Sequence, residues 1–336
     1  MRSGEVRNVL RRRCAGRSSR RAAGAIPTGL VSAWARPAGL ALSTSLAGAP
    51  AAAQGTAAAR PGVDIPGALL VGPARGAVVA VGGAMESPEI YRRFIELAGG
   101  PDALIVLVPT ALGDGVYDNN FAGVAAWRAQ GARNLTLLHT NDRAQADTEG
   151  FVDPLRRAGG VFFFGGRQWL LADVYGGTRT EQELRGVLER GGVVGGTSAG
   201  ASILGSFLVR GDTASNDVVI GDHQVGFGLL RGVAIDQHVL RRNRHFDLIE
   251  VVESHPEVLG IGLDEDTAII VRGNSAEVIG DSYALVFDDR TTTGRDGRFY
   301  FLAPGDGLDL WTRTPARPSR TDGPVPNLER RPWLRD

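Results

Sequence analysis

The chain has 336 residues, and its 37 basic residues, all of them arginines, balance 37 acidic ones. The absence of lysine excludes a Schiff-base enzyme, a lysine-containing phosphate-binding loop and a lysine general base. A single cysteine, Cys14, excludes an intrachain disulfide, and the five histidines lack the HExxH spacing of a zinc hydrolase. We therefore expect no metal ion or other cofactor.

The charge is distributed unevenly along the chain. Residues 1–54 contain nine arginines and one acidic residue, Glu5, whereas the rest carries 28 arginines against 36 acidic residues, a net charge of −8. Nucleic-acid binding depends on clustered positive charge, which this acidic body lacks. We expect no nucleic-acid partner.

Residues 1–54 carry the features of an export signal in the expected order. An arginine-rich region containing Arg20-Arg21 precedes a small, apolar region and then Ala51-Ala52-Ala53, a site for cleavage before Gln54. The apolar region is too short for a stable membrane span, and the arginine pair suits twin-arginine export as well as Sec export. The alternative is an extension without function or an upstream start codon. We expect a periplasmic or extracellular protein with a linker at 55–75.

From residue 77 the sequence alternates between short apolar runs and amphipathic stretches. The apolar runs predict strands at Ala77–Val81, Leu104–Val108, Leu135–Leu138, Val161–Phe164 and Val193–Val194. Helices are predicted from Ser87 to Gly99, at Asp118–Gln130, before Gly159, from Thr178 to Arg190, at Ala199–Leu204 and from Arg241 to Ser254. Strands that are apolar throughout indicate an α/β fold with a mostly parallel sheet and helices on both faces.

Beyond Ala268 the apolar runs become shorter. Those at Ile269–Val271, Glu277–Ile279, Leu285–Phe287 and Phe299–Leu302 predict partly antiparallel strands, a short C-terminal β extension. We therefore expect a single α/β domain at 76–310. Residues 311–336, rich in proline and arginine, are expected to form a loose tail.

The most informative motif is Gly196-Thr197-Ser198-Ala199-Gly200. It follows a predicted buried strand and precedes a predicted helix, which is the context of a nucleophile elbow. The glycines permit the sharp turn, and the N–H that follows the serine can help to bind an oxyanion. An ordinary turn in a glycine-rich chain is the alternative, but the placement favours a catalytic Ser198.

A catalytic serine needs a base and an acid that orients the base. His238 directly follows an apolar, strand-like run and is the best placed of the five histidines, with His223 as a weaker candidate. A later acidic run supplies Asp264, Glu265 and Asp266. If that run is extended, Glu265 points away from the two aspartates, but the pattern does not choose the face that meets the histidine.

Four motifs, in the same order over residues 77–288, resemble those of the cyanophycinases, within a wider group of serine dipeptidase E-like peptidases. They are Gly165-Gly-Arg-Gln168, Gly196-Thr-Ser-Ala-Gly-Ala201, Ile235-Asp-Gln-His238 with Arg242-Asn-Arg244, and Gly260-Ile-Gly-Leu-Asp-Glu-Asp-Thr-Ala268. The resemblance implies a flavodoxin-like, class I glutamine amidotransferase-like fold. It implies that Ser198 is the nucleophile, His238 the base and Glu265 the acid that orients it.

The same resemblance implies binding roles for further residues. The backbone N–H groups of Gly166 and Ala199 would form the oxyanion hole. A peptide substrate would be bound by the side chains of Gln168, Asp236, Gln237, Arg242 and Arg244. A homodimer is also implied.

Two residues depart from the family pattern. Arg167 stands where the family usually has aspartate, and Asp247 stands where cyanophycinases tend to have a third arginine. Cyanophycin is an aspartate backbone with arginines attached through side-chain amides. On the predicted helix Asp247 would pair with Arg244 or repel that backbone. We therefore expect short β-aspartyl peptides to be cleaved faster than cyanophycin, and Asp247→Arg to improve cyanophycin cleavage.

The sequence thus predicts a serine peptidase that cleaves aspartyl or β-aspartyl peptide bonds. One alternative is an amidase or esterase with the same elbow. Another is a binding protein on an inactive scaffold, but such a protein would be expected to lose Ser198, His238 or Glu265, and the chain has all three.

Export predicts a shortened protein. When the full gene is expressed in a host with its own kind of export machinery, N-terminal sequencing of the protein outside the cytoplasm should begin near Gln54, because the small residues before it suit signal peptidase. Soluble cytoplasmic protein that retains Met1 would contradict the prediction.

Overall fold

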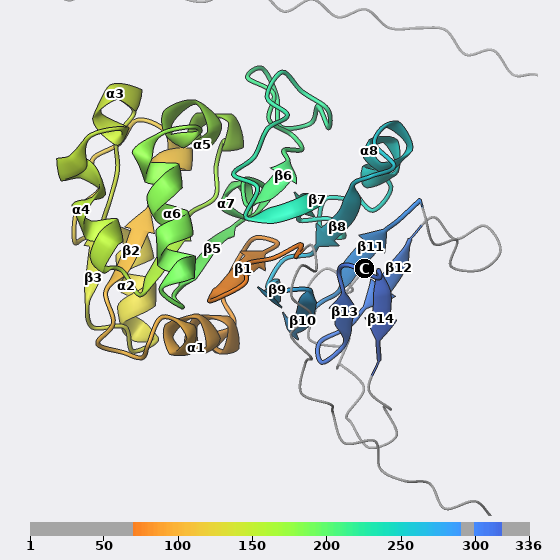
Figure 1. Ribbon diagram of the computed structural model, residues 1–336, viewed down its shortest axis with the longest axis horizontal. Coiled ribbons are helices and arrows are strands. Elements are labelled where there is room, and N and C mark those ends of the chain that lie inside the picture. The colour runs from red at the N-terminus through yellow and green to blue at the C-terminus, as the bar shows by residue number, and fades with distance from the viewer. Residues whose placement is uncertain (1–69, 290–298, 318–336) are drawn as a thin grey trace, which may run out of the picture. The chain divides into compact units, whose positions relative to one another are not determined.

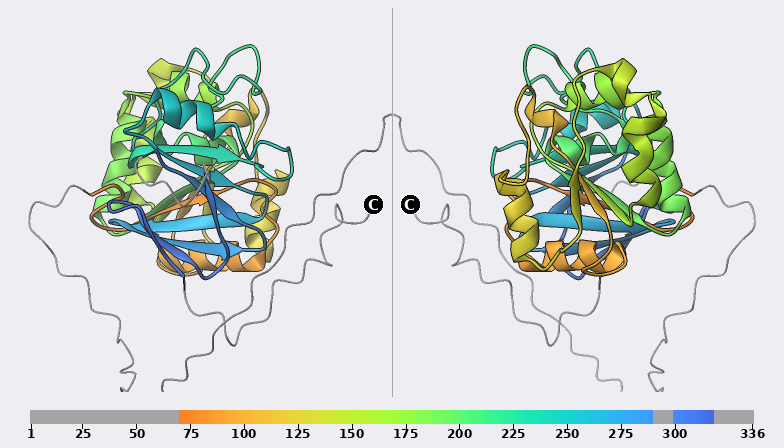
Figure 2. Two further views of the ribbon diagram at one scale, coloured as in Figure 1. Left: turned by 90° about the vertical axis from the view of Figure 1, so that its right-hand side faces the viewer. Right: turned by 90° about the vertical axis from the view of Figure 1, so that its left-hand side faces the viewer.

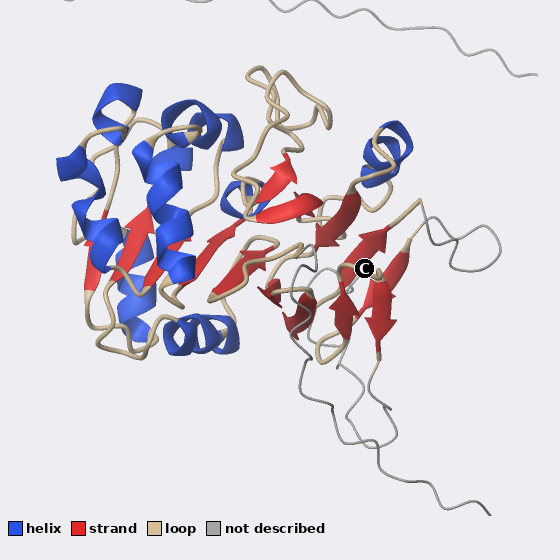
Figure 3. Cartoon of the chain, in the orientation of Figure 1, coloured by secondary structure: helices blue, strands red, loops and turns tan. Residues whose placement is uncertain are grey.

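The computed structural model describes residues 70–289 and 299–317. The predicted export signal at 1–54, most of the linker at 55–75 and the end of the predicted tail lie outside the described residues. Two β-sheets and the helices packed on them make up the described part (Figures 1 and 3). Within that part, no helix is both long and apolar enough to cross a bilayer.

Five parallel strands form one half of the larger sheet, in the order β1-β5-β4-β2-β3. They are β1 (Ala77–Val81), β2 (Ile105–Val108), β3 (Leu135–Leu137), β4 (Gly160–Phe163) and β5 (Val193–Thr197). The helices between them are α1 (Pro88–Leu97), α2 (Ala122–Ala129), α3 (Arg143–Ala146), α4 (Glu149–Arg157), α5 (Gln168–Tyr175) and α6 (Arg179–Glu189), with a 3-10 turn η1 (Thr110–Leu112). Each of these strands begins within one residue of its predicted start.

Helices cover both faces of the parallel strands, as the apolar strands predicted (Figure 2). On one face Phe162 of β4 packs edge-to-face against Phe94 of α1 and Trp127 of α2, with ring centroids 5.3 and 5.0 Å away. On the other face its neighbour Phe163 joins the core formed with α4, α5 and α6, which includes Leu184. Burial on both faces explains why these strands carry no charged residues.

Antiparallel strands continue the sheet beyond β1. A second sheet has the strand order β12-β11-β8-β7-β6. The continuation consists of β9 (Thr267–Arg272), β10 (Ser275–Gly280), β13 (Gly307–Asp309) and β14 (Thr314–Ala316). The second sheet consists of β6 (Gly205–Phe207), β7 (Leu230–Gln237), β8 (Leu259–Leu263), β11 (Ala284–Phe287) and β12 (Tyr300–Leu302), with α8 (Leu248–Ser254) packed on it. The β extension is thus larger than the sequence indicated.

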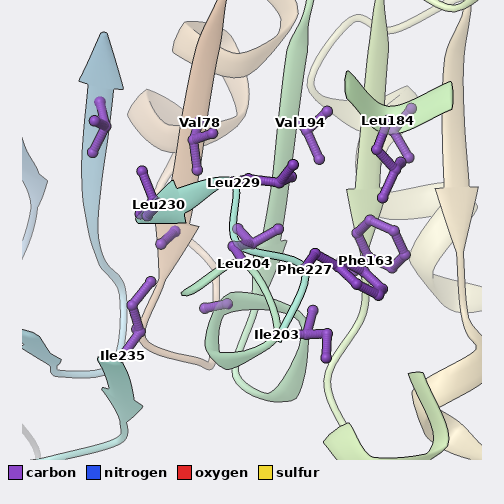
Figure 4. Packing of buried hydrophobic residues seen from close by; sticks show 14 of the residues in the cluster. Val78, Phe163, Leu184, Val194, Ile203, Leu204, Phe227, Leu229, Leu230 and Ile235 are labelled. Carbon is purple, nitrogen blue, oxygen red and sulfur yellow. The ribbon is translucent and has the colours of Figure 1, made fainter. Parts of the chain in front are cut away.

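The short helix α7 (Ala199–Ser202) lies between the two sheets and is buried along its whole length. Figure 4 shows Ile203 and Leu204, which follow it, among Val194 of β5 and Ile235 of β7. Packing on all sides fixes the turn that leads into α7, although the helix is too short to be stable alone.

The helix expected from Arg241 to Ser254 begins later than predicted. Residues 241–247 are not helical, and α8 begins only at Leu248, because Asn243 adopts a left-handed φ of 57° that interrupts a helix. Ordered contacts are also seen on both sides of the expected domain at 76–310. The N–H of Gly72, in the expected linker, donates to Gly273 O at 2.8 Å, and β14 lies in the expected tail.

Candidate active site

Ser198 occupies a strained turn between β5 and α7. Its φ of 55° and ψ of −117° are unfavourable for a residue with a side chain. Both flanking glycines are required by close approach: a Cβ at Gly196 would lie 2.2 Å from Gly200 O, and one at Gly200 would lie 2.3 Å from Phe163 O. The predicted nucleophile elbow is therefore present, with its serine held at the carboxyl end of a central strand.

Ser198, His238 and Glu265 form one chain of hydrogen bonds. His238 Nε2 lies 2.9 Å from Ser198 Oγ, and His238 Nδ1 lies 2.7 Å from Glu265 Oε1. A carboxylate at Nδ1 favours the tautomer that carries its proton there, which leaves Nε2 to accept the serine proton. The structure thus brings together the three residues predicted as a catalytic triad.

The two aspartates beside Glu265 have other partners. Asp264 Oδ1 accepts the N–H groups of Leu240 and Arg241 at 3.1 and 2.9 Å, immediately after His238. Asp266 Oδ1 accepts two N–H groups of the segment before α1, at 2.9 and 2.7 Å. The run is a turn rather than an extended segment, so the period-two argument was wrong in its premise even though Glu265 alone meets the histidine.

Three consecutive carbonyls at the end of β1 accept hydrogen bonds from the segments that carry the triad. Val81 O accepts from the N–H of Ser198 at 2.9 Å, and Gly82 O accepts from that of His238 at 2.8 Å. Gly83 O accepts from the N–H of Asp266, next to Glu265, at 2.8 Å. Sequence reasoning missed this role, although a Gly-Gly pair directly after a buried strand was a usable signal.

Gly83 also supports the base directly. A Cβ at this position would lie 2.1 Å from His238 Cε1 and 2.5 Å from Nε2, so the imidazole rests against the glycine backbone. Gly83 has a φ of 125°, which also favours glycine.

Burial lowers the pKa of His238, and the positive charges of Arg242 and Arg244 lower it further, while the hydrogen bond and charge of Glu265 oppose the shift. The imidazole is therefore neutral near neutral pH. A neutral imidazole is the form that can remove a proton from serine.

The predicted oxyanion groups lie next to Ser198. A Cβ at Gly165 would lie 3.0 Å from Ser198 Cβ, which places the loop of Gly165 and Gly166 beside the nucleophile. Ala199 is the first residue of α7, where N–H groups have no partner within a helix. Among the described residues, neither Ala199 N–H nor Gly166 N–H donates a backbone hydrogen bond outside its own element. Their joint role as an oxyanion hole stays a prediction.

Two of the predicted substrate ligands are fully buried. Gln168 and Asp236 both have an exposed fraction of 0%. Gln168 Nε2 donates to Val209 O at 3.0 Å, and Asp236 forms a two-point ion pair with Arg210 at 2.7 and 2.8 Å. Both side chains are thus buried and held by partners within the chain, and their predicted contact with a substrate stays a prediction.

The other three predicted ligands differ in exposure. Arg242 is exposed, Arg244 has an exposed fraction of only 7%, and Gln237 is buried with its Oε1 accepting from Arg244 Nη1 at 3.0 Å. The carboxylate nearest to Arg244 is that of Asp217, 3.5 Å away and with 91% of its side chain exposed. Arg242 and Arg244 remain as candidates for holding a substrate carboxylate.

The expected pairing of Asp247 with Arg244 was wrong. Its carboxylate pairs with Nη2 of the buried Arg210 at 2.5 Å and not with Arg244, since residues 241–247 do not form the helix that would bring Asp247 beside Arg244. Asp247→Arg would place a second guanidinium against Arg210, so we no longer expect that change to help cyanophycin cleavage. Arg210 was missed because its partners lie 26 and 37 residues away in sequence.

The weaker histidine candidate lies outside this group. His223 contacts Asp222 at 2.8 Å and Asp173 at 2.9 Å, and no contact to Ser198 is seen.

Within residues 70–289 and 299–317, no three His, Cys, Asp or Glu side chains are grouped so as to hold a metal ion.

The chain is similar to known proteins in sequence and in structure. Residues 78–279 match the model of peptidase family S51. A cyanophycinase from Geminocystis herdmanii is 33% identical over 221 residues, covering 64% of this chain and 81% of that protein. One from a Nostoc species is 31% identical over 263 residues, covering 71% and 87%. The crystal structure of a peptidase from an acI-B1 actinobacterium shares the fold, with a TM-score of 0.55, 23% identity and coverage of 70% of this chain and 97% of that one.

The charge near His238 gives a pH prediction. Arg242→Gln removes a positive charge that lowers the pKa of His238, so that pKa should rise and the acidic limb of kcat/KM should move to higher pH, because the imidazole must be neutral to act as a base. The measurement is the pH profile of kcat/KM for both proteins. Arg92→Gln, an exposed change on α1, is the control and should leave the limb in place, and an unmoved limb in Arg242→Gln would refute the assignment of His238.

Proposed function

We propose a mechanism and a substrate class from one premise: this chain belongs to peptidase family S51 and is a serine-type peptidase. The proposed reaction is hydrolysis of aspartyl or β-aspartyl peptide bonds. The proposed fold type is that of the class I glutamine amidotransferases, for which the parallel strands, their helices and the elbow give support.

The observation that carries the mechanism is the hydrogen-bonded chain from Ser198 through His238 to Glu265. Ser198 Oγ attacks the scissile carbonyl while His238 Nε2 takes its proton. The imidazolium then gives that proton to the leaving amine, and water attacks the acyl-enzyme by the reverse sequence. Glu265 holds the ring in the required tautomer and stabilises its positive charge.

The negative oxygen of the tetrahedral intermediate needs donors on the side of Ser198 away from the base. The N–H groups of Gly166 and Ala199 are proposed to supply them. The position of Ala199 at the start of a helix supports this, since the first N–H groups of a helix favour a negative charge.

Preference for aspartyl groups is proposed to come from Arg242 and Arg244. Burial lowers the pKa of Arg244, and so does the neighbouring charge of Arg210, which indicates a cation that its surroundings neutralise incompletely. Asp217 meets it only at 3.5 Å from an exposed position. A substrate carboxylate could replace Asp217 there and form the two-point contact that a planar guanidinium favours.

Within this class we favour cyanophycin, the polymer after which the curated relatives are named. The sequence-based argument against it depended on a repulsive charge at Asp247. In the structure that charge faces Arg210. The other departure, Arg167, donates from Nη2 to the carbonyls of Asp212 and Thr213, so it too has a partner within the chain.

The test is a set of initial rates on purified cyanophycin and on a panel of β-aspartyl dipeptides. Wild-type protein should release β-Asp-Arg dipeptides from the polymer, and Ser198→Ala should lower the rate by about 10⁴-fold or more, because triad members act as a unit. Equal melting temperatures would show that the variant folds. Intact polymer together with rapid dipeptide cleavage would refute cyanophycin, and normal turnover by a folded Ser198→Ala would refute the mechanism.

A further inference from the structure

The connection between β6 and β7 is joined to the loop beside Ser198 by two side chains. Asn216 Nδ2 donates to the carbonyl of Gly166 at 3.2 Å. In the opposite direction, Arg167 Nη2 donates to Thr213 O at 2.8 Å and to Asp212 O at 3.2 Å. Segments about fifty residues apart in sequence thus hold each other.

These contacts fix the peptide unit between Gly166 and Arg167 from both sides. Its carbonyl accepts from Asn216, and its N–H donates to Ala111 O at 2.7 Å. Because a peptide unit is planar, fixing both polar groups fixes its orientation. Gly166 itself has a φ of 135°, and a Cβ there would lie 2.0 Å from Ala111 O, so only glycine fits.

Glycine can adopt the widest range of φ and ψ. Both angles of Gly166 determine the direction of its N–H relative to its carbonyl. The restraint that a side chain would give elsewhere must therefore come from hydrogen bonds to the loop. Asn216 supplies the one that reaches the carbonyl of Gly166.

Asn216 is held on its other side by the segment that leads to the base. Its carbonyl accepts from Arg210 Nη1 at 3.2 Å. Arg210 has an exposed fraction of 1% and is paired with Asp236, two residues before His238. Asn216 therefore connects the loop of Gly166 to the strand that carries the histidine.

The amide of Asn216 is satisfied on one side only. Its Oδ1 is buried and has no hydrogen-bond partner among the described residues. A buried acceptor without a partner costs stability, so stability alone does not account for asparagine here. The feature that the amide does provide is the N–H that it directs at Gly166.

From these contacts we infer that Asn216 is a positioning residue, which orients the N–H of Gly166 toward the oxyanion. The inference rests on the proposed roles of Ser198 and Gly166, and does not depend on the substrate. Arg167 assists from the same loop by holding the connection in place.

The experiment compares Asn216→Ala and Asn216→Asp with wild type. Alanine removes the donor, and aspartate keeps the shape but places an oxygen against the carbonyl of Gly166. Val218→Ala, a half-exposed position in the same connection, is the matched control. Measured are kcat, KM, the melting temperature, the pH of the acidic limb, and the rate at which a small fluorophosphonate labels Ser198, since its phosphoryl oxygen needs the same donors as the oxyanion.

Both Asn216 variants should lower kcat and the labelling rate together, by about 10- to 100-fold, the range in which a misplaced oxyanion donor acts. KM and the melting temperature should stay at wild-type values in both variants, the acidic limb should stay in place in the uncharged Asn216→Ala, and Val218→Ala should change nothing. A wild-type labelling rate in both variants would overturn the inference, as would a loss explained by unfolding or by KM alone.

Failure of the proposed substrate gives a different result. If wild type cleaves no aspartyl peptide but is labelled at Ser198, and the Asn216 variants slow that labelling, the substrate class is wrong and the positioning role stands. If wild type is not labelled at all, the mechanism and the positioning role both fail.

Discussion

The arrangement of the site depends on the carboxyl end of β1. Three successive carbonyls there, those of Val81, Gly82 and Gly83, each accept an N–H from a segment that carries a member of the Ser-His-Glu group. The strand is rigid because β5 pairs with it in parallel on one side and β9 antiparallel on the other. Groups from three distant parts of the sequence therefore share one reference, which is what catalysis by fixed geometry requires.

A second feature of the site is the buried Arg210 and its two carboxylate partners. Arg210 pairs with both Asp236 and Asp247, so that one buried guanidinium is shared between two carboxylates. A buried ion pair contributes little net stability, but removing one partner is costly, so such a group acts mainly to define one arrangement. The positive charges of Arg242 and Arg244 lie close enough to His238 to lower its pKa.

The sequence predicted what depends on local pattern and missed what depends on distant contacts. The parallel strands and the elbow at Ser198 followed from apolar runs and glycine spacing. The helix expected from Arg241 begins only at Leu248, because Asn243 adopts a left-handed φ of 57° that interrupts a helix. Arg210 carries no local signal at all, and the choice of Glu265 among three carboxylates came from family resemblance.

The most direct test of this account is the activity of Gly83→Ala. The new Cβ would meet the imidazole of His238, so we predict a folded protein whose kcat is lower by about 100-fold or more. Gly100→Ala is the matched control, since Gly100 also has a positive φ, 101°, but no atom within 4 Å of the added carbon. Near-normal kcat in a folded Gly83→Ala protein would contradict the claim that the end of β1 positions the base.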